Sequence, residues 1–289
     1  MEGNRQDGRT QDQIRTISIT YDAFGYADAS LLFVMGHTKV LISVSIKQGV
    51  PQFLKGSGKG WLTAEYAMLP CATGDRTMRE SQQNQRNTRS VEISRLIGRC
   101  LRSVVNLDCI GERTITIDCD VLQADGSTRV ACITGASRAL ELAYRRWLNA
   151  HIVSYMFFKE PIAAISAGCV NGLVCVDLAY AEDSQCDADF NFVFTQSGNI
   201  IEIQGTAEKA PLSEQAFDQL KKGALQGVQA LFQACNTFPF PEDDGTRIIG
   251  QGLVANKKQQ AKAQPVNQAT NQMQSGKGQF FSLAQRVSK

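Results

Sequence analysis

Apolar and polar residues alternate along several segments of the chain, and this alternation predicts β-strands. In residues 114–121 the side chains of Ile115, Ile117, Cys119 and Val121 fall on one face, as in a half-buried strand. Four upstream segments are also predicted to be strands, the first three as a β-meander: residues 14–21, 29–34, 39–46 and 61–69.

Apolar residues spaced three and four positions apart predict helices. Residues 93–105 keep this spacing throughout and carry arginines on the opposite face. Residues 130–142 hold mainly small and apolar side chains with Gly135 as the one breaker, and this helix is expected to continue to about residue 150. Residues 213–234 are amphipathic again. Between the last two helices we expect a hairpin around Asn171-Gly172 and then a second strand pair: residues 162–170, 173–178, 192–195 and 200–204.

The turn between the strand at 114–121 and the next helix is a candidate anion site. Asp125-Gly126 supply turn geometry, and Ser127 and Thr128 supply hydroxyls at a helix N-terminus, whose free N–H groups favour an anion. Arg129 in the first helical turn opposes the helix dipole by up to about 1 kcal/mol unless an anion lies beside it. Two interpretations stay open, a phosphate site and an ordinary capped helix with a solvated arginine.

A second arginine lies at a second helix N-terminus. Arg89 stands between Thr88 and Ser90, the candidate caps of the helix at 93–105. Two such arginines favour a common anion between the two helix ends. Seven arginines lie between positions 76 and 102, so an RNA or polyphosphate surface competes with a merely solvated basic face.

Four carboxylates fall within the eight residues 182–189. Such a cluster is usually a solvated loop. Asp189, however, begins an apolar strand, where a partly buried carboxylate with a raised pKa can act as a general acid. Asp183 and Asp189 together can instead hold a hard cation such as Mg²⁺ through oxygen ligands.

Composition restricts the remaining chemistry. The 289 residues are 43% hydrophobic, enough for a sizeable core, and no apolar run of about 18 residues or N-terminal signal predicts a membrane span or secretion. Nine cysteines without a C-x-x-C pair predict buried free thiols in a reducing compartment. Two histidines argue against a histidine-based triad or metal site, so carboxylates and arginines must carry any chemistry.

Charge separates the chain into an acidic body and a basic tail. Residues 251–289 carry six cations and no acid, so the net charge of +2 leaves −4 on residues 1–250. We expect a folded domain at residues 1–244 and a disordered Gln- and Lys-rich tail at 245–289. The tail is passive, recruits RNA, or docks through Phe280, Phe281 and Leu283.

Seven motifs together resemble the ribonuclease PH family, phosphate-dependent exoribonucleases that trim the 3′ ends of tRNA. The resemblance covers about residues 4–240 and excludes the tail. The motifs are RQDGR at 5–9, GHTKV at 36–40, GWLTAEYAMLP at 60–70, EISRLIGR at 92–99, DCDVLQADG at 118–126, residues 180–191, and QGTAE at 204–208.

The resemblance implies a fold and an assembly. The family fold is α+β, a single domain of mixed β-sheets packed with helices, similar to the ribosomal-protein-S5-like fold and containing a left-handed βαβ crossover. The family forms a homo-hexameric ring, a trimer of dimers, in the cytoplasm. The usual rule for crossovers predicts the opposite hand, so the handedness rests on the resemblance alone.

The resemblance also assigns roles to residues. Phosphate, the co-substrate, is matched to Arg89, Ser127, Thr128 and Arg129. The acid and Mg²⁺-binding pair is matched to Asp183 and Asp189. The arginines that guide RNA are matched to Arg76, Arg79 and Arg86. Two positions depart from the family pattern, because Ser127 replaces a usual Gly and Cys71 a usual Arg.

The implied reaction is phosphorolysis, in which orthophosphate releases nucleoside diphosphates from the RNA 3′ end. Two alternatives stay open. A non-catalytic RNA-binding ring subunit of the same fold is expected to have lost the matched residues, all of which are present here. A hydrolytic nuclease has no use for an anion site at two helix N-termini.

Overall fold

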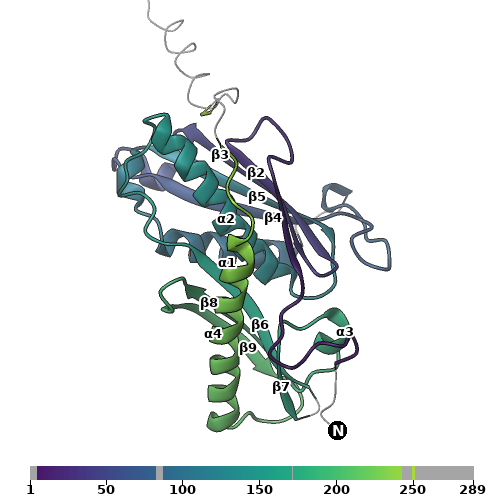
Figure 1. Ribbon diagram of the computed structural model, residues 1–289. Coiled ribbons are helices and arrows are strands. Elements are labelled where there is room, and N and C mark those ends of the chain that lie inside the picture. Colours follow the sequence, from purple (N-terminus) through teal and green to yellow (C-terminus); the bar gives the residue numbers. More distant parts are fainter. Residues whose placement is uncertain (1–4, 83–86, 171, 243–248, 251–289) are drawn as a thin grey trace, which may run out of the picture.

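The computed structural model describes residues 5–82, 87–170, 172–242 and 249–250 (Figure 1). Its strands are β1 Ile17–Tyr21, β2 Ala29–Met35, β3 Thr38–Gln48, β4 Trp61–Met68, β5 Arg113–Gln123, β6 Ile162–Val170, β7 Leu173–Val176, β8 Ala188–Thr195 and β9 Ile200–Ala207. Its α-helices are α1 Thr88–Ser103, α2 Thr128–Asn149, α3 Tyr180–Asp183 and α4 Glu214–Asn236. Short 3₁₀ turns are η1 Gln52–Leu54, η2 Glu80–Gln82 and η3 Leu107–Ile110.

The first sheet has the strand order β1-β2-β3-β5-β4. All of its pairs are antiparallel except β4 and β5, which are parallel neighbours joined through α1. This β4–α1–β5 unit is where a βαβ crossover occurs. Its left hand stays a prediction from the resemblance.

The alternation seen in the sequence places one face of this sheet in the core. Ile115, Ile117, Cys119 and Val121 of β5 are at most 1% exposed. The apolar face of α1 covers β4, with Ile93 and Ile97 fully buried. Burying this continuous apolar surface is what holds the helices against the sheet.

The second sheet has the order β7-β6-β8-β9 and is antiparallel throughout. Helix α2 lies between the two sheets and contacts β2, β3 and β6, while α4 packs on β6 and β7 (Figure 1). Because α2 is covered on both sides, most of its residues are buried. A Cβ on Gly135 would lie 2.4 Å from Ile42 Cδ1, so this glycine permits the close approach of α2 to β3.

The α+β class and the main elements are therefore as predicted, with several strands longer than expected. The predicted caps of α1 were wrong. Asn87 caps this helix, its side chain accepting from the Arg89 N–H at 2.9 Å, whereas the Ser90 hydroxyl donates to Glu80. Within the described residues, no helix is long and apolar enough to cross a membrane. The division at residue 244 stays a prediction, and the tail, apart from residues 249–250, lies outside the described residues.

Candidate active site

The turn before α2 is held by hydrogen bonds that were not expected. Ser127 adopts a left-handed conformation, with φ 56°, and its hydroxyl donates to Leu178 O at 2.8 Å instead of capping the helix. The Thr128 hydroxyl lies 3.1 Å from the buried Tyr66 hydroxyl. The Ser127 side chain is thus directed away from a phosphate donor role. The first N–H groups of α2 still lack partners within the helix, as at any helix N-terminus.

Gly126 brings this turn against the segment that precedes the acidic residues. Its φ is +72°, and a Cβ there would lie 2.7 Å from Tyr180 N and 2.9 Å from Leu178 O. Both contacts are with backbone, which cannot swing aside. The absence of a side chain at Gly126 is therefore what lets the start of α2 and the start of α3 touch.

The two arginines at helix N-termini lie within electrostatic reach of the same pair of carboxylates. Arg129 donates to Gln204 Oε1 of β9 at 3.2 Å and lies 3.5 Å from Glu92 Oε1. Arg89, in the first turn of α1, is exposed. Burial raises the pKa of Asp183 and of Asp189, and the positive charges of Arg89 and Arg129 oppose that rise, so both arginines lie within electrostatic reach of each carboxylate.

Asp189 is the second residue of β8, paired with Gly168 of β6 and Thr206 of β9. A Cβ on Gly168 would lie 2.6 Å from Ala188 O, so only glycine fits beside this strand. Among the described residues, no group hydrogen-bonds the buried Asp189 Oδ1. Burial, followed by the nearby charge of Asp183, raises the pKa of Asp189 to about 6.

Asp183 ends α3, a single helical turn after β7. Burial raises its pKa, opposed by the charges of Arg89, Arg129 and Arg15. Two partly buried carboxylates, one with an oxygen lacking a partner, form a donor set suited to a hard cation. No group of three or more His, Cys, Asp or Glu side chains suited to a metal occurs within the described ranges. This pair fits Mg²⁺, which usually takes one or two carboxylates, waters and substrate phosphates.

The matched RNA-guiding arginines lie on the segment between β4 and α1. Arg76 and Arg79 are exposed there. Arg86 lies outside the described residues. No contact joins Arg76 or Arg79 to the carboxylate pair in the described part of the chain, so their RNA-guiding role stays a prediction.

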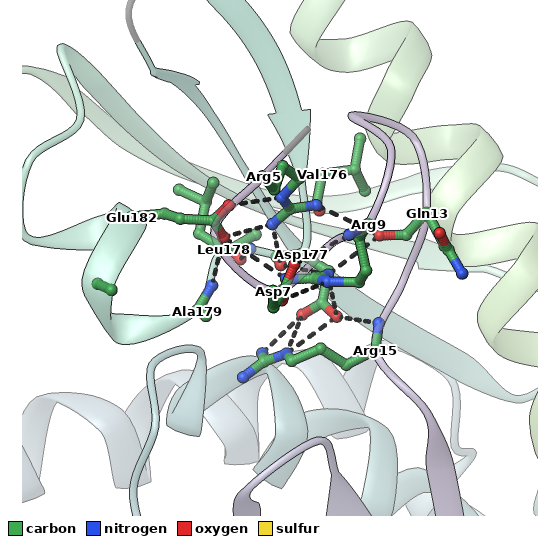
Figure 2. Close-up of polar contacts among 12 residues, drawn as sticks. Arg5, Asp7, Arg9, Gln13, Arg15, Val176, Asp177, Leu178, Ala179 and Glu182 are labelled. Carbon is green, nitrogen blue, oxygen red and sulfur yellow. Dashed lines mark hydrogen bonds and ion pairs between the residues drawn. The ribbon is translucent and has the colours of Figure 1, made fainter. Parts of the chain in front are cut away.

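Sequence reasoning missed a layer of residues that support the site. Tyr66 lies under Thr128, and burial, with Cys132, raises its pKa to about 12, so it stays a neutral hydrogen-bonding group. Arg15, Asp177 and Glu182 form a buried polar network beside α3 (Figure 2). Arg15 pairs with Asp177, and Glu182 pairs with Arg5, and in each pair the two residues are more than 160 positions apart in the sequence. No spacing rule signals such a pairing.

Comparison with known families identifies the family of this chain. Residues 13–145 match domain 1 of the 3′ exoribonuclease family, and residues 160–227 match its domain 2. The chain belongs to the 3′ exoribonuclease family. Within that family it is similar to ribonuclease PH of Neisseria meningitidis serogroup B, with 48% identity over 225 residues, 78% of this chain and 93% of that protein. Ribonuclease PH of Bacillus cereus is also 48% identical over 225 residues, which are 92% of its length.

Solved structures of this family share the fold. A rice Rrp46 structure has a TM-score of 0.65 at 22% identity, covering 81% of this chain and 99% of that one. The Archaeoglobus fulgidus exosome with RNA bound to the active site has a TM-score of 0.66 at 21% identity, covering 80% and 92%. At these identities the likeness supports the exoribonuclease fold and no more.

Proposed function

We propose that Arg89, Thr128 and Arg129 bind orthophosphate beside the carboxylates Asp183 and Asp189, and that this is where the chain acts on RNA. The chain is a phosphorolytic 3′→5′ exoribonuclease of the ribonuclease PH type, a nucleotidyltransferase that trims tRNA 3′ ends with phosphate as co-substrate. The observation that supports the site assignment is the close approach of the start of α2 to the start of α3 at Gly126, which leaves Arg89 and Arg129 within electrostatic reach of one carboxylate pair.

The reaction assigns each group a step. An oxygen of the bound orthophosphate attacks the terminal phosphorus in line, and the bond to the 3′ oxygen of the preceding nucleotide breaks. Asp189, whose pKa is raised to about 6, gives a proton to that leaving oxygen. The arginines and the free N–H groups of α2 stabilise the charge on the phosphates. The products are a nucleoside diphosphate and an RNA shortened by one nucleotide.

Mg²⁺ at Asp183, with Asp189 as a further ligand, is part of the proposal. When bound, the ion supplies positive charge that offsets the charge developing on the phosphates. The support is the oxygen-only donor set and the partnerless Asp189 oxygen. In this proposal Asp183 is mainly the ligand and Asp189 mainly the acid.

Incubating RNA with and without orthophosphate tests the function. We expect nucleoside diphosphates in phosphate and no release without it. Nucleoside monophosphates released at equal rates in both buffers would indicate hydrolysis instead. No release under either condition would favour a non-catalytic RNA-binding subunit.

The assembly and location follow from the same family. We propose a homo-hexamer, a trimer of dimers, which sedimentation velocity would identify by its mass. A cytoplasmic location is supported by the nine cysteines, all of which are free thiols. RNA guidance by Arg76, Arg79 and Arg86 belongs to this proposal as well, supported by their charge and by the exposure of Arg76 and Arg79.

A further inference from the structure

Three arginines of the N-terminal segment are buried in a polar network that contains none of the proposed reacting groups. Arg5, Arg9 and Arg15 are 8%, 7% and 6% exposed, although arginine is normally a surface residue. Their acidic partners, Asp177 and Glu182, are also buried (Figure 2). Such a network is costly to bury unless each charge is paired and hydrogen-bonded, as it is here.

Arg15 joins the two halves of the proposed site. Its Nη2 and Nε donate to the Asp177 carboxylate, the shorter bond being 2.6 Å, and its Nη1 donates to the carbonyl oxygen of Asp125 at 2.6 Å. Asp177 precedes α3, which carries Asp183, and Asp125 precedes α2, which carries Thr128 and Arg129. The Arg15 guanidinium therefore contacts both the turn before α2 and the segment that leads into α3.

The acidic end of this connection is itself firmly held. Asp177 is 0% exposed, adopts φ 57°, and also accepts from the Arg15 backbone N–H at 2.7 Å. Glu182 accepts from Arg5 and from the Ala179 N–H, the latter at 2.9 Å. A four-residue helix is too short to be stable alone. These contacts with the N-terminal segment therefore orient α3.

We propose that Arg15 is a positioning residue, which sets the spacing between the phosphate-binding turn at 125–129 and the carboxylates Asp183 and Asp189. The proposal rests on the proposed function, because it needs phosphate to bind at that turn. Arg15 acts through Asp125 and Asp177. Replacing Arg15 is therefore expected to change how phosphate is placed for attack and to leave the RNA-binding surface unaltered.

The Arg15→Lys variant tests the proposal in the full-length protein. Lysine keeps a positive charge near Asp177, but a single ammonium cannot reproduce the two-sided fork of a guanidinium. Misplacement by about 1 Å can cost up to two decades in rate. We expect the KM for orthophosphate to rise and kcat to fall, each by at least about tenfold, with RNA affinity measured without phosphate unchanged.

The KM for phosphate separates positioning from a merely structural role. Loss of folded protein lowers the apparent kcat but leaves KM alone. The matched control is Arg138→Lys, since Arg138 is another largely buried arginine that donates to the Tyr21 hydroxyl and to Phe238 O, away from the site. We expect a normal phosphate KM in this control. A similar rise in both variants would mean general loosening and would overturn the proposal.

A second variant covers the case in which Arg15→Lys does not fold. Arg15→Met with Asp177→Asn removes both charges together, so no unpaired charge stays buried, and asparagine tolerates the left-handed backbone at 177. The same rise in phosphate KM is expected. If Arg129→Ala raises the phosphate KM but a folded Arg15 variant does not, the positioning role of Arg15 is overturned and the proposed phosphate site stands. If Arg129→Ala also has no effect, the phosphate site itself is wrongly placed.

Discussion

Arg129 is the side chain on which the phosphate site most depends at the scale of single residues. It lies in the first turn of α2, where its charge is unfavourable to the helix dipole; it donates to Gln204 and forms a partly exposed ion pair with Glu92 at 3.5 Å. A bound phosphate would add a second counter-charge beside the helix N-terminus. The helix N-terminus and the arginine then favour the same ligand.

Replacing Arg129 with alanine should weaken phosphate binding. A charge-assisted hydrogen bond contributes about 1.5–3 kcal/mol, so the apparent phosphate KM should rise by about one to two decades. Arg145→Ala is the control, because Arg145 lies on the same helix but is exposed and pairs with Glu141. If Arg129→Ala leaves the phosphate KM unchanged, Arg129 is a solvated helix residue with no part in phosphate binding.

Asp189→Asn should separate catalysis from RNA binding. Removing a general acid or metal ligand should lower kcat by about two decades or more, while RNA affinity stays nearly the same. Asp187→Asn is the control, because Asp187 forms a surface pair with Lys209 at 2.7 Å. Equal losses in the two variants would mean that the acidic segment acts as a block of charge or as a folding element.

At this scale the sequence predicts reacting groups but not the residues that support them. Helix-terminal arginines and an acid at the start of an apolar strand are local signals. The Ser127 hydroxyl was predicted to cap α2 or contact phosphate, and it donates instead to Leu178, 51 residues away. The role of Arg15 depends on Asp177, 162 residues away. Such contacts depend on tertiary structure and leave no periodic pattern.

At the scale of elements, the site depends on how closely the turn before α2 approaches α3. Gly126→Ala places a Cβ against backbone atoms 2.7 and 2.9 Å away. We expect lower stability together with a raised phosphate KM. Gly198→Ala is the control, because Gly198 also has a positive φ, +89°, but its nearest neighbour would be a side-chain atom at 3.8 Å.

Both glycine variants should lose about 1 kcal/mol or more of stability from the left-handed backbone, measured by urea unfolding. Only Gly126→Ala should change the phosphate KM. If the two variants behave alike in kinetics, the close approach of the two elements has no part in phosphate binding.

The anchor of α3 predicts a specific pH dependence of stability. Burial alone would raise the pKa of Glu182, but the hydrogen bonds from Arg5 and the Ala179 N–H outweigh it and hold the pKa below its usual 4.5. A lowered folded-state pKa contributes stability above the unfolded pKa and loses it as pH falls. Glu182→Gln should therefore have a lower free energy of unfolding than wild type at neutral pH, and this difference should be smaller at about pH 3.

This difference is measured as the urea unfolding midpoints of wild type and Glu182→Gln, each at neutral pH and at about pH 3. Asp187→Asn again serves as the comparison, because its surface pair is screened by solvent and should contribute little at either pH. A Glu182→Gln difference that does not vary with pH would show that charge on Glu182 has no part in holding α3.

Elements were predictable where periodicity is strong. The strands of the first sheet and the helices α1, α2 and α4 follow from alternation and from three-and-four spacing. The single turn of α3 was missed, because four residues are too few for a periodic signal. The parallel pairing of β4 with β5 was also not derivable, since the hydrophobic pattern of one strand does not specify its neighbour.

At the scale of the whole molecule, charge is divided between an acidic body and a basic tail. Residues 251–289 carry six cations and no acid. Deleting them should weaken RNA binding by a similar amount for RNAs of different base sequence. The log–log salt slope should flatten by up to about 4 units if every cation contacts a single-stranded phosphate at about 0.7 each. Turnover at saturating RNA should hardly change, because none of the matched site residues lies in the tail.

RNA affinity at several salt concentrations, for full-length and truncated protein, measures this effect. Parallel lines of equal affinity would rule out recruitment and leave a passive tail or one that docks through Phe280, Phe281 and Leu283.

We propose that orthophosphate bound at the two helix N-termini is the nucleophile. Unlabelled RNA incubated with radiolabelled orthophosphate tests this directly, followed by separation of the released nucleotides. We expect label in nucleoside diphosphates, and far less label in Arg129→Ala at low phosphate, recovering as phosphate is raised. Unlabelled nucleoside monophosphates as the product, or labelling that Arg129→Ala leaves unchanged, would contradict it.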